Sequence, residues 1–227
     1  MSDEAFDAFE GDWEPFGDGF DWGEYQWRNY LNDTERDAAR FLSFYNSVKE
    51  KPNHLDEAAR LMGWDVDDIG LTDDGEVDDS SSDDEFDSSE PYTLHRHPVF
   101  VVTHALCRYL QQSWEQLIRS EALPIHSLLH WQYAKALHQG EINAIMAVQA
   151  LDLGDYGLVV CHLKNALNMV NQALGLLDEI LPGEFEPILS FKKEMRIRLF
   201  DLRELWLRIM GDCRAEVQRR GSDPEGN

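Results

Sequence analysis

The fold is decided by residues 155–181, which read DYGLVVCHLKNALNMVNQALGLLDEIL. Apolar residues recur there at intervals of three and four positions, from Val159 through Leu163 and Ala166 to Val170 and beyond. This spacing lines the apolar side chains up along one stripe of an α-helix, as in the seams of helical bundles. We therefore expect residues 155–181 to form a long helix that packs against others.

Three further segments have helical periodicity, namely residues 98–121, residues 124–152 and a stretch from Pro187 to about residue 219. Pro98 and Pro124 suit the first turns of their helices, and Gly154 followed by Asp155 predicts a tight reversal. Long helices joined by short connections pack as antiparallel neighbours. The sequence therefore predicts an all-α fold with an antiparallel four-helix bundle over residues 95–219.

Small or polar residues recur at regular intervals within the second of these helices, which favours close approach of a neighbouring helix. They are Gln132, Ala136, Gly140, Asn143 and Ala147.

Residues 25–64 are predicted to form a two-helix segment. Thr34 is placed to cap the first helix, with Asp37 three positions later, and Gly63 is placed to end the second. About forty residues rarely bury a core of their own. We therefore expect this segment to pack on the bundle or on a partner.

The formal net charge of −24 is concentrated in the first part of the chain. Residues 1–94 contain 28 Asp and Glu against 6 Lys and Arg, whereas residues 95–227 contain 16 against 14. Phosphate binding and attraction to anionic membranes both need Lys and Arg. The composition therefore argues against direct binding to nucleic acid or membranes and favours a partner with a basic surface.

The acidic residues define the remaining divisions of the chain. Residues 1–24 mix acids with aromatic residues, and we interpret them as a disordered tail. Residues 65–94 are interpreted as an extended acidic linker, and residues 220–227 as a second tail. Cys107, Cys161 and Cys213 predict buried free thiols in a reducing compartment. Together with the lack of a signal-peptide pattern and of a membrane-length apolar run, they predict a cytoplasmic protein.

The aromatic residues near the N-terminus lead to the main functional hypothesis. In a non-enzymatic interaction or adaptor protein, aromatic anchors fill a partner's groove while the acids meet its basic rim. The predicted anchors are Trp13, Phe16, Phe20, Trp22, Trp27 and Tyr30. A basic strip on the last helix, marked by Arg196, Arg203 and Arg214, is a second predicted contact surface, for the acidic region of this or another copy.

Two alternatives remain open from the sequence. In the first, the run from Asp73 to Glu90 imitates nucleic-acid phosphates and inhibits a basic nucleic-acid-binding protein. In the second, the bundle binds a metal or cofactor, with possible enzymatic activity. Counting along antiparallel helices places His104 opposite Gly140 and His162 opposite Ala144, with Glu204 near the same level. His104, His162 and Glu204 are thus the candidate metal ligands.

Residues 65–76 also show acids at the first, third and ninth positions, glycine at the sixth and glutamate at the twelfth. The segment resembles an EF-hand loop, and the resemblance implies calcium binding. No catalytic signature and no cofactor motif is present, and the oligomeric state is left open by the sequence.

Overall fold

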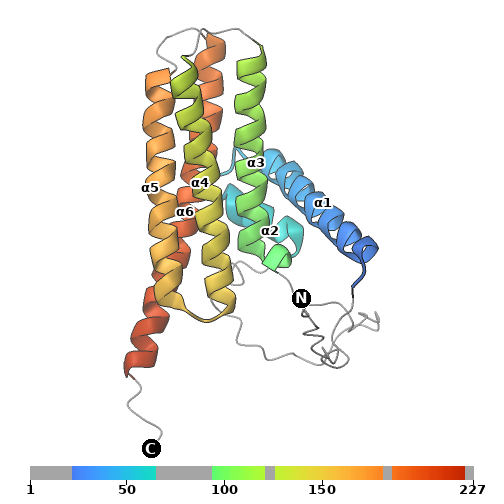
Figure 1. Ribbon diagram of the computed structural model, residues 1–227, viewed down its shortest axis with the longest axis vertical. Helices are drawn as coiled ribbons and strands as arrows, with labels where there is room; N and C mark the ends of the chain where they lie inside the picture. Colours follow the sequence, from blue (N-terminus) through green and yellow to red (C-terminus); the bar gives the residue numbers. More distant parts are fainter. Residues whose placement is uncertain (1–21, 65–93, 121–125, 181–185, 223–227) are drawn as a thin grey trace, which may run out of the picture.

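The computed structural model describes residues 22–64, 94–120, 126–180 and 186–222, and in these segments all regular secondary structure is helical (Figure 1). The α-helices are α1 (Glu24–Val48), α2 (His54–Met62), α3 (Pro98–Arg119), α4 (Ser127–Asp152), α5 (Tyr156–Ile180) and α6 (Glu186–Ser222). A short 3-10 turn, η2 (Leu94–Arg96), precedes α3. The predicted all-α class is confirmed.

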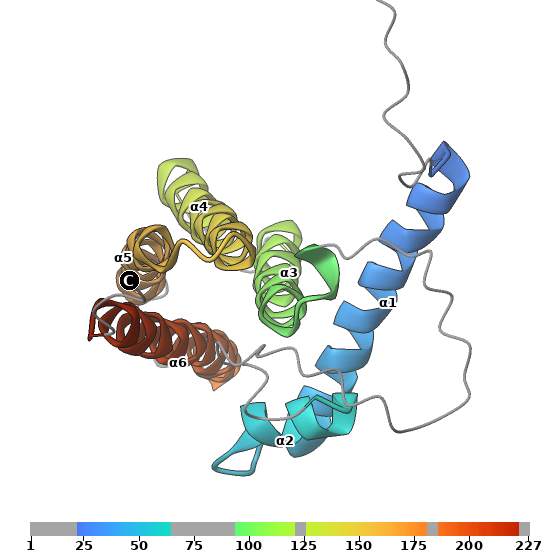
Figure 2. The ribbon, with the colours of Figure 1, turned by 90° about the horizontal axis from the view of Figure 1, so that it is seen from below.

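Helices α3 to α6 form the predicted antiparallel four-helix bundle. Seen along its axis, α3, α4, α5 and α6 follow one another around the bundle, and α6 closes it against α3 (Figure 2). The helices are 22 to 37 residues long, so that the bundle is a rod rather than a globule. Its ends therefore provide little surface, and most accessible side chains lie along the outer faces of the helices.

The turn between α4 and α5 is the tight reversal predicted from Gly154 and Asp155. Gly154 adopts a φ of 70°, a left-handed conformation that costs glycine little. The Asp155 carboxylate then accepts a hydrogen bond of 3.0 Å from the backbone N–H of Leu158, as an N-cap does. The start of α4 differs from the prediction, because His126 rather than a residue near Pro124 caps this helix. Its Nδ1 accepts the backbone N–H of Leu128 at 3.2 Å.

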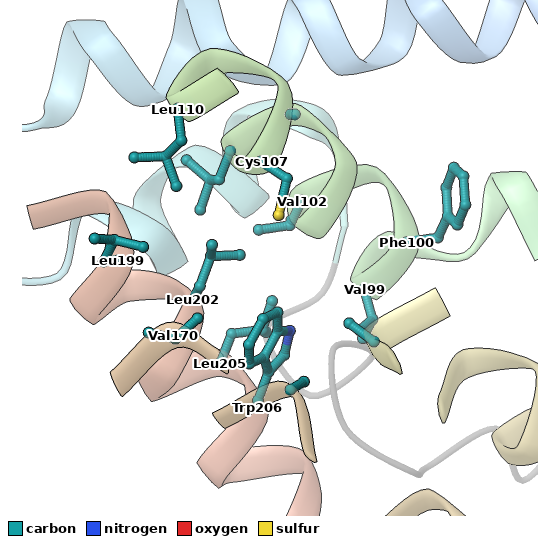
Figure 3. Packing of buried hydrophobic residues seen from close by; sticks show 14 of the residues in the cluster. Val99, Phe100, Val102, Cys107, Leu110, Val170, Leu199, Leu202, Leu205 and Trp206 are labelled. Carbon is teal, nitrogen blue, oxygen red and sulfur yellow. The ribbon is translucent and has the colours of Figure 1, made fainter. Parts of the chain in front are cut away.

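The core runs along the middle of the bundle and contains the predicted seam of α5. Val159, Leu163, Ala166, Val170 and Leu177 are all buried. Figure 3 shows part of this core, where side chains of α3, α5 and α6 point toward one another. Apolar burial on this scale is the main force that holds the bundle together.

Helices α4 and α5 approach closely along the small residues of α4. Ala136, Gly140, Ala144 and Ala147 are buried there. A Cβ atom at Gly140 would lie only 3.6 Å from the Cβ of Met169 on α5. The close approach expected from the stripe of small residues is confirmed.

Helices α1 and α2 form a hairpin that packs on the outside of the bundle, against α3 and α6 (Figures 1 and 2). The predicted cap at Thr34 is wrong. Helix α1 begins ten residues earlier, at Glu24, and the Thr34 hydroxyl donates to the carbonyl of Tyr30 from inside the helix. Gly63 ends α2 as predicted, with a φ of 87°.

Candidate interaction surface

The buried stripe of α1 continues past the edge of the bundle and becomes exposed. Its members are spaced alternately by four and three residues, the period of a packed helix seam. They are Trp27, Leu31, Thr34, Ala38, Phe41, Tyr45 and Val48. Thr34 and the four later members are buried, whereas Trp27 is 42% and Leu31 49% exposed. The first two turns of α1 therefore present an apolar stripe that the described structure covers only in part.

Aromatic rings form a cluster at this end of α1. The ring centroids of Trp22 and Trp27 lie 5.0 Å apart, and that of Tyr30 lies 5.6 Å from Trp22 and 5.9 Å from Trp27. Tyr30 lies on the inner side of the cluster, and its ring centroid is 5.6 Å from that of His95 in η2. The cluster is thus held on the bundle by Tyr30, while the two tryptophans reach the surface.

The predicted aromatic anchors therefore fall into three groups. Trp13, Phe16 and Phe20 lie outside the described residues. Trp22 and Trp27 are partly accessible, but Tyr30 is buried against its own chain, only 4% exposed. The sequence analysis missed Leu31, which a helix beginning before Trp27 would have revealed, because Leu31 follows Trp27 by four residues.

The charged residues near this apolar end are distributed unevenly between α1 and the chain that precedes it. Helix α1 itself is nearly balanced, with four acids and three arginines, and Arg28 pairs with Glu24 at 2.6 Å. Residues 1–21, which lead directly into it, contain eight acids and no Lys or Arg. The exposed aromatic end is therefore attached to a strongly negative stretch of chain.

The hairpin is held on α6 by a set of buried polar contacts that we call the hairpin clamp, comprising Tyr45, His54, Arg198 and Asp201. The Asp201 carboxylate accepts a short hydrogen bond from the Tyr45 hydroxyl and lies 2.9 Å from His54 Nε2. Asp201 is 5% and Arg198 1% exposed. Buried polar groups of this kind fix the relative position of two elements, because a shifted arrangement leaves them unsatisfied.

Arg198 completes the clamp through Asn46, the residue that follows Tyr45 on α1. Its Nη2 donates to Asn46 Oδ1 at 2.9 Å, and its Nη1 donates to Glu194 Oε1 at 2.7 Å. The guanidinium lies 3.7 Å from the ring centroid of Tyr109 on α3, in a cation–π contact. One buried arginine therefore joins α1, α3 and α6.

The clamp alters the ionisation of its members. Burial, together with the adjacent Asp201 carboxylate, raises the pKa of Tyr45 far above its usual value, so that the phenol stays protonated and donates. Burial alone would lower the pKa of His54. The hydrogen bond and negative charge of Asp201 outweigh that effect and raise the pKa above 6.5.

Raising the pH is therefore expected to weaken the docking of the hairpin. The stabilisation from protonated His54 is complete below the unfolded-state pKa of about 6.5 and is lost as the pH rises through the higher folded-state value. Urea unfolding of the wild type and of His54→Gln between about pH 5.5 and 8.5 measures this effect. At low pH the wild type should be more stable than His54→Gln, and this difference in the free energy of unfolding should shrink as the pH rises. A difference that does not change with pH would contradict the role of protonated His54 in the clamp.

Most cations of α6 already have acidic partners within the described segments. Arg196 contacts Asp178 of α5 at 3.0 Å, and Arg208 contacts Asp56 of α2 at 2.5 Å. Of the three arginines predicted to mark a basic strip, Arg203 and Arg214 form no ion pair within the described part of the chain, and Arg214 is exposed. The contact between α6 and the N-terminal region runs through Arg198 and Arg208, which the sequence analysis did not select.

Comparison with family models, with curated proteins and with solved structures found no match to this chain. Among the described helices, none has the length and apolar character needed to cross a membrane.

The predicted metal ligands are not brought together. His104 Nδ1 lies 3.0 Å from Glu141 on α4, as its predicted position near Gly140 requires, and its Nε2 lies 3.3 Å from Glu35 on α1. Glu204 instead pairs with Arg208. Within the segments that the structure describes, no group of three or more His, Cys, Asp or Glu is arranged to hold a metal ion. The EF-hand-like residues 65–76 lie outside those segments.

Proposed function

We propose that this chain is a non-enzymatic interaction protein that binds a basic partner through its N-terminal region. The observation that supports the proposal is the exposed continuation of the α1 stripe at Trp27 and Leu31. A partner helix or groove would cover this stripe, while the eight acids of residues 1–21 would meet a basic rim.

The surrounding structure supports a passive, pre-organised role for α1. The clamp holds Tyr45 on the bundle, and Tyr30 anchors the aromatic cluster near the exposed end. A helix fixed at two places presents its exposed side chains with little loss of conformational entropy on binding. Cys107 and Cys213 are buried free thiols, as predicted, whereas Cys161 is an exposed free thiol. Free thiols support a reducing compartment, for which we propose the cytoplasm.

The proposal separates an apolar contribution from an electrostatic one, and two variants test them. Trp27→Ser/Leu31→Ser should reduce capture of the partner from a cell extract at every salt concentration. Deletion of residues 1–21 should reduce capture at about 0.1 M salt and have little effect at about 1 M, where charges are screened within roughly 3 Å. Mass spectrometry identifies the captured proteins, which should have basic surfaces.

Leu189→Ser is the matched control, because Leu189 is an exposed leucine on α6, away from α1. It should capture as the wild type does, and circular dichroism should show the same helical content in all variants. Capture that survives both the double substitution and the deletion would exclude the N-terminal region as the binding site.

A further inference from the structure

The outer surface of α4 and α5 forms a face without acidic side chains on a strongly acidic protein. We define this α4–α5 face by its accessible residues, which are apolar or carry side-chain amides. They are Gln139, Ile142, Asn143 and Met146 on α4, and Leu158, Asn165, Asn168 and Met169 on α5. Six of them line a shallow groove with a volume of about 370 Å³.

No acid lies on this face. Between residues 136 and 151 the only Asp or Glu is Glu141, which bonds His104 and Gln111 of α3, and between residues 156 and 177 there is none. Two exposed lysines border the face, because Lys135 lies one turn before Gln139 and Lys164 lies one turn before Asn168.

We infer that the α4–α5 face is the interface of a homodimer related by a twofold axis. Such an interface brings the same patch of both copies together, so that its side chains must complement themselves. Asn and Gln carry a donor and an acceptor on one group and satisfy this condition, as apolar side chains do. A carboxylate does not, because it meets a second carboxylate.

Charge and size both favour a second copy as the occupant. Each copy has a formal charge of −24, so that two copies associate best through a face that carries no acids. The stretches 136–151 and 156–177 contain 16 and 22 residues and are about 24 and 33 Å long, and two helices packed side by side are about 20 Å wide. The face thus offers roughly 500–650 Å² per copy, at the lower end of the ~600–1,000 Å² per partner of specific interfaces.

Sedimentation velocity of the full chain between about 1 and 100 µM tests the dimer, because this range covers micromolar dissociation constants. The wild type should form dimers within this range at 0.15 M salt. Raising the salt to about 0.5 M should strengthen dimerisation, because the repulsion between the two acidic chains is screened while the apolar and amide contacts of the interface are little affected.

Asn165→Asp/Asn168→Asp is the decisive variant, because it changes two exposed side chains to charged groups of the same shape. It should raise the dimer dissociation constant at least tenfold at 0.15 M salt. The matched control is Asn29→Asp/Asn32→Asp, which adds the same charge at exposed positions of α1 and should change dimerisation much less. A wild type that remains monomeric at 100 µM, or equal effects of the two variants, would overturn the proposal.

Discussion

Replacing Asp201 with alanine is expected to release the α1–α2 hairpin from α6 and to cost about 3–5 kcal/mol, as breaking a buried charged network does. Asp201 is the shared acceptor of the clamp, because both the Tyr45 hydroxyl and His54 Nε2 bond to the same carboxylate oxygen. Without it, two largely buried polar groups lose their partner at once. Each unsatisfied group contributes about 1–3 kcal/mol of that cost.

Hydrogen exchange measured by mass spectrometry locates the effect. In Asp201→Ala, amides of α1 and α2 should exchange faster, while those of α4 and α5 keep their protection, because the hairpin packs on α3, α6 and the turn η2. Glu204→Ala is the matched control, since Glu204 is an exposed acid one turn further along α6. It should cost no more than about 1 kcal/mol, as exposed ion pairs do. Uniform loss of protection across all helices would show instead that the hairpin and bundle unfold together.

The same clamp connects the fold to the proposed function. Helix α1 carries the exposed Trp27 and Leu31 at one end, and at the other end the clamp residue Tyr45 with its neighbour Asn46, which bonds Arg198. If the clamp orients α1, Asp201→Ala should also weaken partner capture, although Asp201 lies far from the exposed stripe along the helix. Its effect on capture should be smaller than that of Trp27→Ser/Leu31→Ser, because residues 1–21 and the aromatic side chains remain.

The bundle could be predicted because its helices and turns are specified by residues that are close together in the sequence. The alternation of three and four in residues 155–181, and the Gly154-Asp155 pair, specify a helix and its boundary without reference to any distant residue. Counting back from the turn between α3 and α4 also placed His104 opposite Gly140, next to Glu141, its observed partner. Antiparallel helices joined by short turns have a register that sequence separation nearly fixes.

The start of α1 and the clamp could not be predicted, because both depend on contacts between residues that are far apart in the sequence. Thr34 has the chemistry of a cap, but helix α1 extends to Glu24, with Tyr30 packing on His95, which is 65 residues away in the sequence. Tertiary contacts thus override a local capping signal. Asp201 meets His54 across 147 residues, and no periodicity indicates which face of α6 the hairpin covers. The same ambiguity misassigned Glu204, which pairs with Arg208 rather than reaching His104.

Replacing Trp206 with alanine is expected to lower the free energy of unfolding of the bundle by about 3–5 kcal/mol, as removal of large core residues does. Trp206 is fully buried on α6, and its Nε1 donates to Thr103 Oγ1 on α3 at 3.2 Å. The substitution removes the apolar contacts of the indole and leaves a cavity between helices. Because domains of this kind are stable by only about 5–15 kcal/mol, this is a large fraction of the total.

Two further variants separate the contributions of the Trp206 ring and its hydrogen bond. Trp206→Phe keeps most of the apolar volume and should cost less than alanine, with the remaining loss due to the smaller ring and the missing donor to Thr103. Trp131→Ala is the matched control, since Trp131 is 67% exposed on α4 and should change the urea midpoint little. Equal losses for Trp206→Ala and Trp131→Ala would mean that α6 does not pack into the bundle through Trp206. The placement of the hairpin on α6, and with it the orientation of the exposed end of α1, would then need a different explanation.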